Sequence, residues 1–133
     1  MRKKLLALFV GLAGVAAGTA FAETQMGPTT AVSLKEFKVL APPGTNSGKV
    51  TFAVRNKGKL KHEFIVVKTN RPAGKLPMKG AVAKLTGVKG KLKPFKPGSL
   101  KKLTLTLKSG KYVLLCNLPG HYKAGQYKSF RVN

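Results

Sequence analysis

The chain has 133 residues and a formal net charge of +23, with 26 lysines and arginines against three glutamates. This length allows one domain with one modest core. So few carboxylates leave little for an enzyme that works by acid–base chemistry, and no zinc-finger spacing or aromatic-interleaved basic motif points to nucleic-acid binding.

The N-terminus has the three parts of a secretory signal peptide. Residues 1–4 are positively charged, residues 5–17 are apolar, and Ala20-Phe21-Ala22 is a small-x-small cleavage site. The apolar segment is short for a membrane anchor, and small residues close it. We therefore predict a signal peptide at residues 1–22, one domain at residues 23–133, and a periplasmic or otherwise exported location.

The predicted exported domain keeps 23 basic residues against the three glutamates, a net charge of +20. A surface of this kind repels copies of itself and attracts negatively charged partners in a salt-dependent way. It favours a monomer that meets an acidic or anionic partner protein, or an anionic membrane surface. The alternative is a solvated surface without a dedicated partner.

In chain order, the first half contains three predicted strands. Residues 30–39 alternate as one strand, bent near Glu36, and residues 49–56 follow after turn residues. Residues 62–68 are apolar on both faces, which is typical of a strand that is covered on both sides. Residues 69–87 have no clear pattern, and within them residues 78–85 are predicted as either a short helix or a loop.

The second half is also β-rich. Residues 88–92 form a short predicted strand, and residues 94–98 a turn. Residues 100–108 alternate, with the side chains of Leu103, Leu105 and Leu107 facing inward. Residues 111–117 and 127–132 are the last two predicted strands. Short strands with turns between them and no long helix predict an all-β, antiparallel β-sandwich.

The single cysteine cannot form an internal disulfide, so in an exported protein it needs another explanation. Cys116 ends a β-like segment, and His121 follows after a Pro-Gly loop. The other histidine, His62, begins another strand, and Gln126 comes five residues after His121. A thiolate, two imidazoles and a weak axial ligand are the donors of blue-copper sites, so copper is the first candidate. The alternatives are a buried inert cysteine and ordinary core or surface histidines.

Two motifs carry a family resemblance: Asn56-x-Gly58-x3-His62-Glu63-Phe64 and Cys116-x4-His121-x4-Gln126. Over about residues 29–132 the chain resembles the small periplasmic cupredoxins of the plastocyanin and azurin kind. The resemblance implies a Greek-key β-sandwich with one type 1 copper, held equatorially by His62, Cys116 and His121. Position 126 is then the axial ligand. Most of the family has methionine there, and the stellacyanin-like branch has glutamine.

The resemblance also implies roles for neighbours of the ligands. The backbone N–H of Glu63 is then expected to donate to the Cys116 sulfur. From the residues alone, the Glu63 side chain is either a link between the ligand loop and the neighbouring strand or an exposed carboxylate among lysines, and Asn117 is a further candidate neighbour of the ligands. Electrons enter and leave at His121, within an apolar collar. Its expected members are Leu118 and Pro119, with Pro43 or Met78 as further candidates. Met78 is also the alternative axial ligand to Gln126.

The leading functional hypothesis is an electron carrier, not an enzyme, that cycles one copper between Cu(II) and Cu(I). Its partner would be an acidic or anionic redox protein such as a cytochrome or oxidase. A second hypothesis is copper handling, by sequestration or delivery. A third is a cationic module for polyanions or anionic membranes, with a vestigial metal site.

Overall fold

The computed structural model describes residues 27–133, so the predicted signal peptide lies outside the described residues. Within them the chain forms these strands: β1 (Thr29–Lys35), β2 (Lys38–Leu40), β3 (Gly44–Thr45), β4 (Gly48–Asn56), β5 (His62–Lys68), β6 (Met78–Lys79), β7 (Val82–Ala83), β8 (Val88–Phe95), β9 (Leu100–Leu107), β10 (Gly110–Leu115) and β11 (Tyr127–Val132). Among these residues there is no helix that is long and apolar enough to span a membrane.

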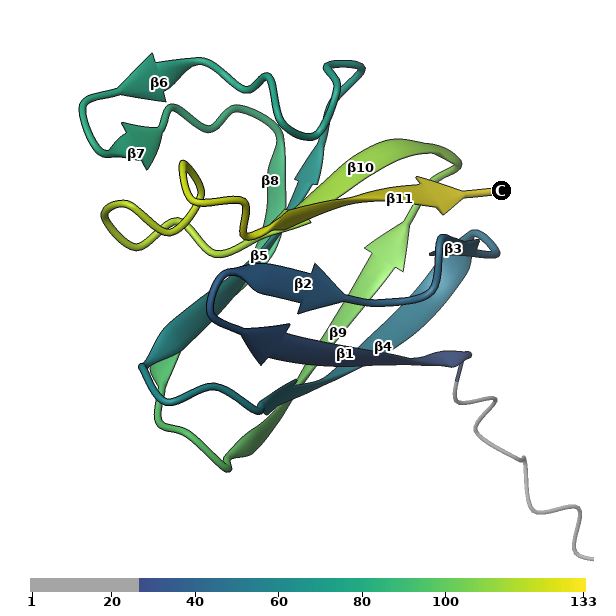
Figure 1. Cartoon of the computed structure of the whole chain (residues 1–133). Helices are drawn as coiled ribbons and strands as arrows, with labels where there is room; N and C mark the ends of the chain where they lie inside the picture. Colours follow the sequence, from purple (N-terminus) through teal and green to yellow (C-terminus); the bar gives the residue numbers. More distant parts are fainter. Residues whose placement is uncertain (1–26) are drawn as a thin grey trace, which may run out of the picture.

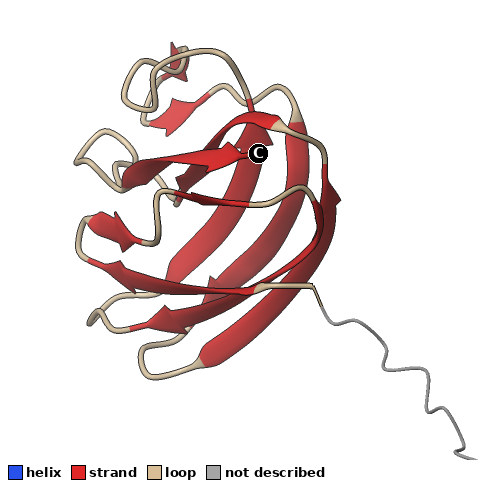
Figure 2. Ribbon diagram, turned by 90° about the vertical axis from the view of Figure 1, so that its right-hand side faces the viewer, coloured by secondary structure: helices blue, strands red, loops and turns tan. Residues whose placement is uncertain are grey.

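Two sheets pack face to face (Figures 1 and 2), with strand orders β2-β1-β4-β9 and β3-β11-β10-β5-β8. The predicted all-β sandwich is confirmed. Two strand pairs, β1–β4 and β3–β11, are parallel, so the sheets are mixed and not purely antiparallel. The reason lies in the connection: after β1 the chain reverses in β2, joins the other sheet as β3, and returns to pair with β1 in the same direction.

The main core lies between the two sheets. Alternate residues of β4, Val50, Phe52 and Val54, are fully buried there, as their period of two predicts. The Phe52 ring packs against Phe64 of β5 and Phe130 of β11, with centroids 5.4 and 5.6 Å apart. Of the predicted inward leucines of β9, Leu107 is buried and the other two are partly buried against the same core.

A second, smaller core covers the outer face of β5 and β10. Residues 69–87 fold back over this face and carry the β6–β7 hairpin, visible at the upper left of Figure 1. The cluster contains Ile65, Val67, Leu76, Ala83, Val113, Leu115 and Tyr122. The Tyr122 hydroxyl donates to the Ala73 carbonyl at 2.6 Å and accepts from the Leu76 N–H at 3.0 Å. Strand β5 is therefore buried on both faces, as its sequence predicts.

Three local predictions differ from the structure. Residues 30–39 form the β1–β2 hairpin, in which Lys35 pairs with Lys38, and not one bent strand. Residues 78–85 contain the β6–β7 hairpin in place of a helix or a plain loop. Strand β8 continues through Pro94 to Phe95, where a turn was predicted. Because β8 is an edge strand it tolerates proline, and the buried side chain of Phe95 keeps its end in the core.

Four connections meet at one end of the sandwich, on the left of Figure 1: those between β1 and β2, β4 and β5, β6 and β7, and β10 and β11. The Glu36 carboxylate accepts hydrogen bonds from the backbone of the β4–β5 loop. The Gly120 N–H of the β10–β11 loop donates to the Ala81 carbonyl at 2.9 Å. These bonds join the four connections in two pairs at the end that carries the candidate site.

Candidate metal centre

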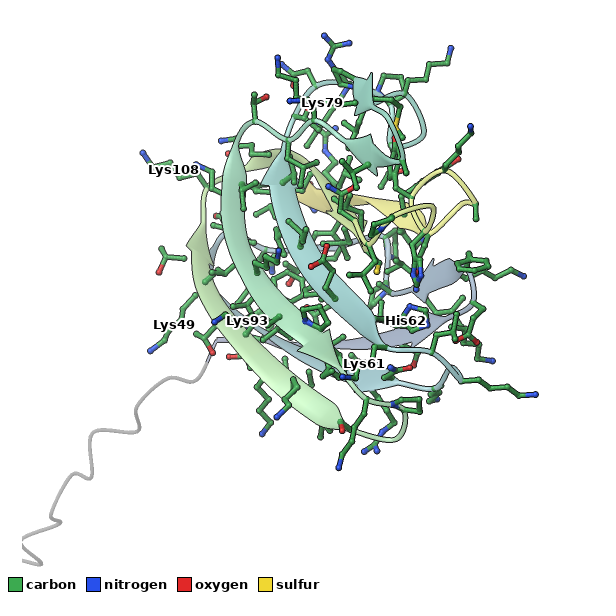
Figure 3. All side chains as sticks on the ribbon, turned by 90° about the vertical axis from the view of Figure 1, so that its left-hand side faces the viewer. Lys49, Lys61, His62, Lys79, Lys93 and Lys108 are labelled. Carbon is green, nitrogen blue, oxygen red and sulfur yellow. The ribbon has the colours of Figure 1, made fainter. Side chains whose placement is uncertain are left out.

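Three side chains converge at this end of the sandwich. His62 begins β5, Cys116 follows the end of β10, and His121 lies in the β10–β11 loop; β5 and β10 are paired, which brings the first two together. One donor atom of each lies within 4.8 Å of the other two. His62 and Cys116 are fully buried, and His121 is half-buried. In Figure 3 this end lies on the right, where His62 is labelled.

The spacing of the donor atoms fits a single metal ion. Nδ1 of His62 lies 3.3 Å from Nδ1 of His121, which lies 3.5 Å from Sγ of Cys116. Two imidazole nitrogens that each lie about 2 Å from one ion, at a trigonal angle, are about 3.5 Å apart. The structure thus brings together the three side chains that were predicted as equatorial ligands. Two imidazoles and a thiolate suit copper, and copper binding itself stays a prediction.

The Cys116 sulfur is held in a buried, partly polar pocket. The backbone N–H of Glu63 donates to Sγ at 3.3 Å, as the family resemblance implied. Burial raises the pKa of the Cys116 thiol, and hydrogen bonds from the backbone of Leu118 and Glu63 offset this only in part. Without a cation beside it the thiol therefore stays protonated and uncharged at neutral pH. A bound metal ion would stabilise the thiolate.

Gln126 is fully buried and contacts both imidazoles. Its Nε2 lies 2.8 Å from the Lys35 carbonyl and 3.1 Å from Nδ1 of His62, and its Oε1 lies 3.0 Å from Nδ1 of His121. A carbonyl only accepts, so it must face the amide NH₂ group. The amide oxygen therefore points toward the donor cluster. Met78, the alternative axial ligand, is 42% exposed on β6. Coordination by Gln126 stays a prediction.

The sequence did not reveal the role of Glu36. Its Oε1 lies 3.0 Å from Nε2 of His62 and accepts from the N–H groups of Lys59 and Leu60, both at 2.7 Å. These hydrogen bonds, of which the one from Leu60 has the largest effect, lower the pKa of Glu36 to about 2. Burial lowers the pKa of His62 despite the carboxylate beside it, so the imidazole is neutral at pH 7. The available signal was chemical: an acid with lysines on either side, at the bend of the first predicted strand.

The Glu63 side chain joins the ligand loop to β8, which is the first of the two alternatives for it. Its Oε1 accepts from the Asn117 N–H at 3.1 Å, and its Oε2 forms an ion pair with Lys91 at 3.0 Å. The Asn117 side chain in turn bonds both backbone groups of Ala83, at 2.8 and 2.9 Å. The segment after Cys116 is therefore fixed on two sides.

His121 has one apolar neighbour that the sequence did not predict. The Phe37 ring meets the His121 ring edge-on, with centroids 5.0 Å apart. Leu118 is half-buried and Pro119 is exposed in the same loop as His121. The prediction for Pro43 is wrong, because its carbonyl accepts from the Arg131 N–H near the far end of β11. The hairpin that brings Phe37 to the site was not foreseen.

No protein-family model and no curated protein sequence matches this chain. Among solved structures, a reduced auracyanin from the photosynthetic bacterium Roseiflexus castenholzii is 22% identical, with a TM-score of 0.60 over 79% of this chain and 96% of that one. A rusticyanin from Thiobacillus ferrooxidans is 16% identical, with a TM-score of 0.61 over 80% and 79%. Another rusticyanin structure, described as a copper protein, is 18% identical, with a TM-score of 0.58 over 80% and 79%. The chain therefore has the cupredoxin fold, with a cluster of one cysteine and two histidines that could hold a metal ion.

Proposed function

We propose that the protein is an electron carrier with one copper ion bound by His62, Cys116 and His121, and with Gln126 as the axial ligand. The observation that carries the proposal is the convergence of one sulfur and two imidazole nitrogens within 4.8 Å at a largely buried site. Copper bound there supplies a one-electron couple. The related fold of a rusticyanin described as a copper protein supports this choice of metal.

The role of the protein in this function is to keep the donor atoms in fixed positions. His62 begins β5 and Cys116 directly follows β10, with which β5 pairs, and Asn117, Gln126 and Glu63 fix the loop that carries His121. A site that changes little between oxidation states has a small reorganisation cost. Because only His121 among the three donors is partly exposed, we propose that electrons pass through its ring, and that the protein is a carrier and not an enzyme.

We further propose that the protein works outside the cytoplasm, in the periplasm or a comparable compartment. This rests on the signal-peptide pattern of residues 1–22.

The proposed partner is an acidic redox protein. Eight exposed lysines lie on or beside the four connections around the site, and we call them the site-end lysines: Lys35, Lys38, Lys57, Lys59, Lys61, Lys79, Lys84 and Lys123. The described residues hold two glutamates, both near the ligands, so the eight lysines leave this end with a net positive charge. Positive charge around the half-buried His121 steers an acidic surface toward it. The same charge would attract anionic membranes, and a self-repelling surface favours a monomer.

The test is to add Cu(II) to the exported domain and record optical and EPR spectra for the wild type and for Cys116→Ser. We expect one copper per chain with an intense thiolate-to-copper absorption band, which the serine variant lacks. Stoichiometric binding by the serine variant with an unchanged spectrum would refute the site. Electron exchange with an acidic cytochrome, without loss of copper to a chelator, separates a carrier from a copper-handling protein.

A further inference from the structure

The contact between Glu36 and His62 is the least expected feature of the site. An ionised carboxylate only accepts hydrogen bonds, so the 3.0 Å contact requires that Nε2 of His62 carries the hydrogen. In a neutral imidazole the other nitrogen then has a free lone pair. That atom, Nδ1, is the one that faces His121 and Gln126.

The carboxylate is itself held in place by the β4–β5 loop. The Lys59 and Leu60 N–H groups both donate to the oxygen that accepts from His62. The buried amide of Asn56 shapes this loop, donating to the Leu60 carbonyl at 2.8 Å and accepting from the Gly58 N–H at 2.9 Å. Asn56 also donates to the Phe95 carbonyl at 3.0 Å, which anchors the loop to β8. The position of Glu36 is therefore set by rigid neighbours.

The β4–β5 loop also leaves space for the contact between Glu36 and His62, and it does so at Gly58. A Cβ atom at Gly58 would collide with Oε1 of Glu36 and would lie 2.7 Å from Nε2 of His62. Gly58 has no positive φ, so its backbone does not require glycine. What requires glycine here is the space beside the carboxylate–imidazole pair.

We propose that Glu36 is a positioning residue of the metal site. Its hydrogen bond holds His62 in the tautomer that presents Nδ1 to the ion, and its negative charge favours the oxidised state of the bound copper. The statement about the tautomer stands on the protein alone, whereas the statement about copper rests on the proposed function. A carboxylate behind a ligating imidazole raises the basicity of the ligand in metal sites generally.

The first experiment uses the metal-free protein and long-range ¹⁵N–¹H NMR of the His62 ring. We expect the Nε2–H tautomer alone in the wild type and in Glu36→Gln, whose amide oxygen still accepts. We expect a mixture of tautomers in Glu36→Ala and in Gly58→Ala. A pure Nε2–H tautomer in both alanine variants would overturn the positioning role.

The second experiment measures the affinities for Cu(II) and Cu(I). We expect Glu36→Gln, which removes only the charge, to lower the ratio of Cu(II) to Cu(I) affinity about tenfold, which raises the reduction potential by about 59 mV. The matched control is Lys59→Gln, which removes a charge from an exposed side chain of the same loop and should change the ratio less than twofold. An unchanged ratio in Glu36→Gln would overturn the electronic role. If the wild type binds no copper, the proposed function fails, and the NMR result still decides the positioning role.

Discussion

The two ends of the β10–β11 pair differ in how they use polar side chains. At the site end, His62, Glu63 and Gln126 are buried and every buried side-chain nitrogen and oxygen of the described residues has a hydrogen-bond partner. At the other end, Lys111 and Arg131 face each other across the two strands beside a cleft of about 340 Å³. Within residues 27–133 no carboxylate pairs with either.

The site end depends on the geometry of its buried polar groups, and the other end on the charge of its exposed ones. A cross-strand pair of like charges is destabilising, and a strongly cationic surface accepts that cost in return for solubility and long-range attraction. A buried polar cluster must instead satisfy every group, because each unpaired one costs about 1–3 kcal/mol. The described part of the chain has two carboxylates, and both lie at the site end. Changes at that end should therefore alter the site, and matched changes at the other end should alter only charge.

The largest expected effect is that of the metal on stability. An ion that binds only the folded state at about 1,000 times its dissociation constant stabilises it by about 4 kcal/mol. The wild type should melt at a lower temperature without copper than with it, whereas Cys116→Ser should melt at the same temperature in both states, as differential scanning calorimetry would show. Lys111→Gln should keep the full shift. A lost shift in Lys111→Gln would mean that the two ends are coupled.

Next in size is the axial position. An amide oxygen is a harder donor than a thioether and favours Cu(II), so Gln126→Met should raise the reduction potential, which voltammetry measures. We expect at least a tenfold change in the ratio of copper affinities, equivalent to about 59 mV. The variant also loses the hydrogen bond to Lys35, at about 1 kcal/mol of unfolding free energy. A potential that stays the same or falls would remove Gln126 from the coordination sphere.

The pH dependence of the metal-free protein should have two steps. The folded-state pKa of His62 lies below its ordinary 6.5, so stability declines as the pH falls through 6.5 and the unfolded chain takes up the proton first. The folded-state pKa of Glu36 is about 2 against an ordinary 4.5. Its contribution is therefore complete above pH 4.5 and is lost as the pH falls toward 2.

Urea unfolding at a series of pH values measures both steps. Glu36→Gln should remove the step between pH 4.5 and 2, whereas Lys111→Gln at the other end should retain it. A wild-type protein whose unfolding free energy is constant from pH 7 to 2 would contradict both assignments.

The smallest expected effect is kinetic. Replacing Lys59 and Lys61 by glutamine should slow electron transfer to an acidic cytochrome several-fold at low salt, and added salt should diminish the difference. Stopped-flow rates across ionic strength measure this. Replacing Lys111 and Arg131, the same number of charges, should slow the reaction less. Equal slowing by the two pairs would show that the net charge matters and the site-end lysines do not.

The sequence predicted the residues that donate to the metal better than it predicted the residues that hold these donors in place. Cys116, His121 and Gln126 lie close together in the chain, so their spacing and the strand before them carry the signal, and the family motif supplies His62. Glu36 lies 26 residues from His62 and reaches it only through the β1–β2 hairpin. That hairpin depends on tertiary packing, which alternation in the sequence does not encode.

The same limit applies to the other wrong predictions. In residues 69–87, strands of two residues pair because Leu76 and Ala83 are buried against β5. Such short pairings have no period to detect. At the end of β8, Pro94 reads as a turn residue, and only the edge position of the strand explains why it is tolerated.

The double covering of β5 has a consequence for how the protein acquires its cofactor. His62 begins a strand with packed side chains above and below it, and Nε2 of its ring, the nitrogen that does not face the donor cluster, is bonded to Glu36. The empty protein should therefore already hold its binding geometry, because neither layer depends on the metal. Loading can follow folding as a late, separate event, without help from a partly unfolded intermediate.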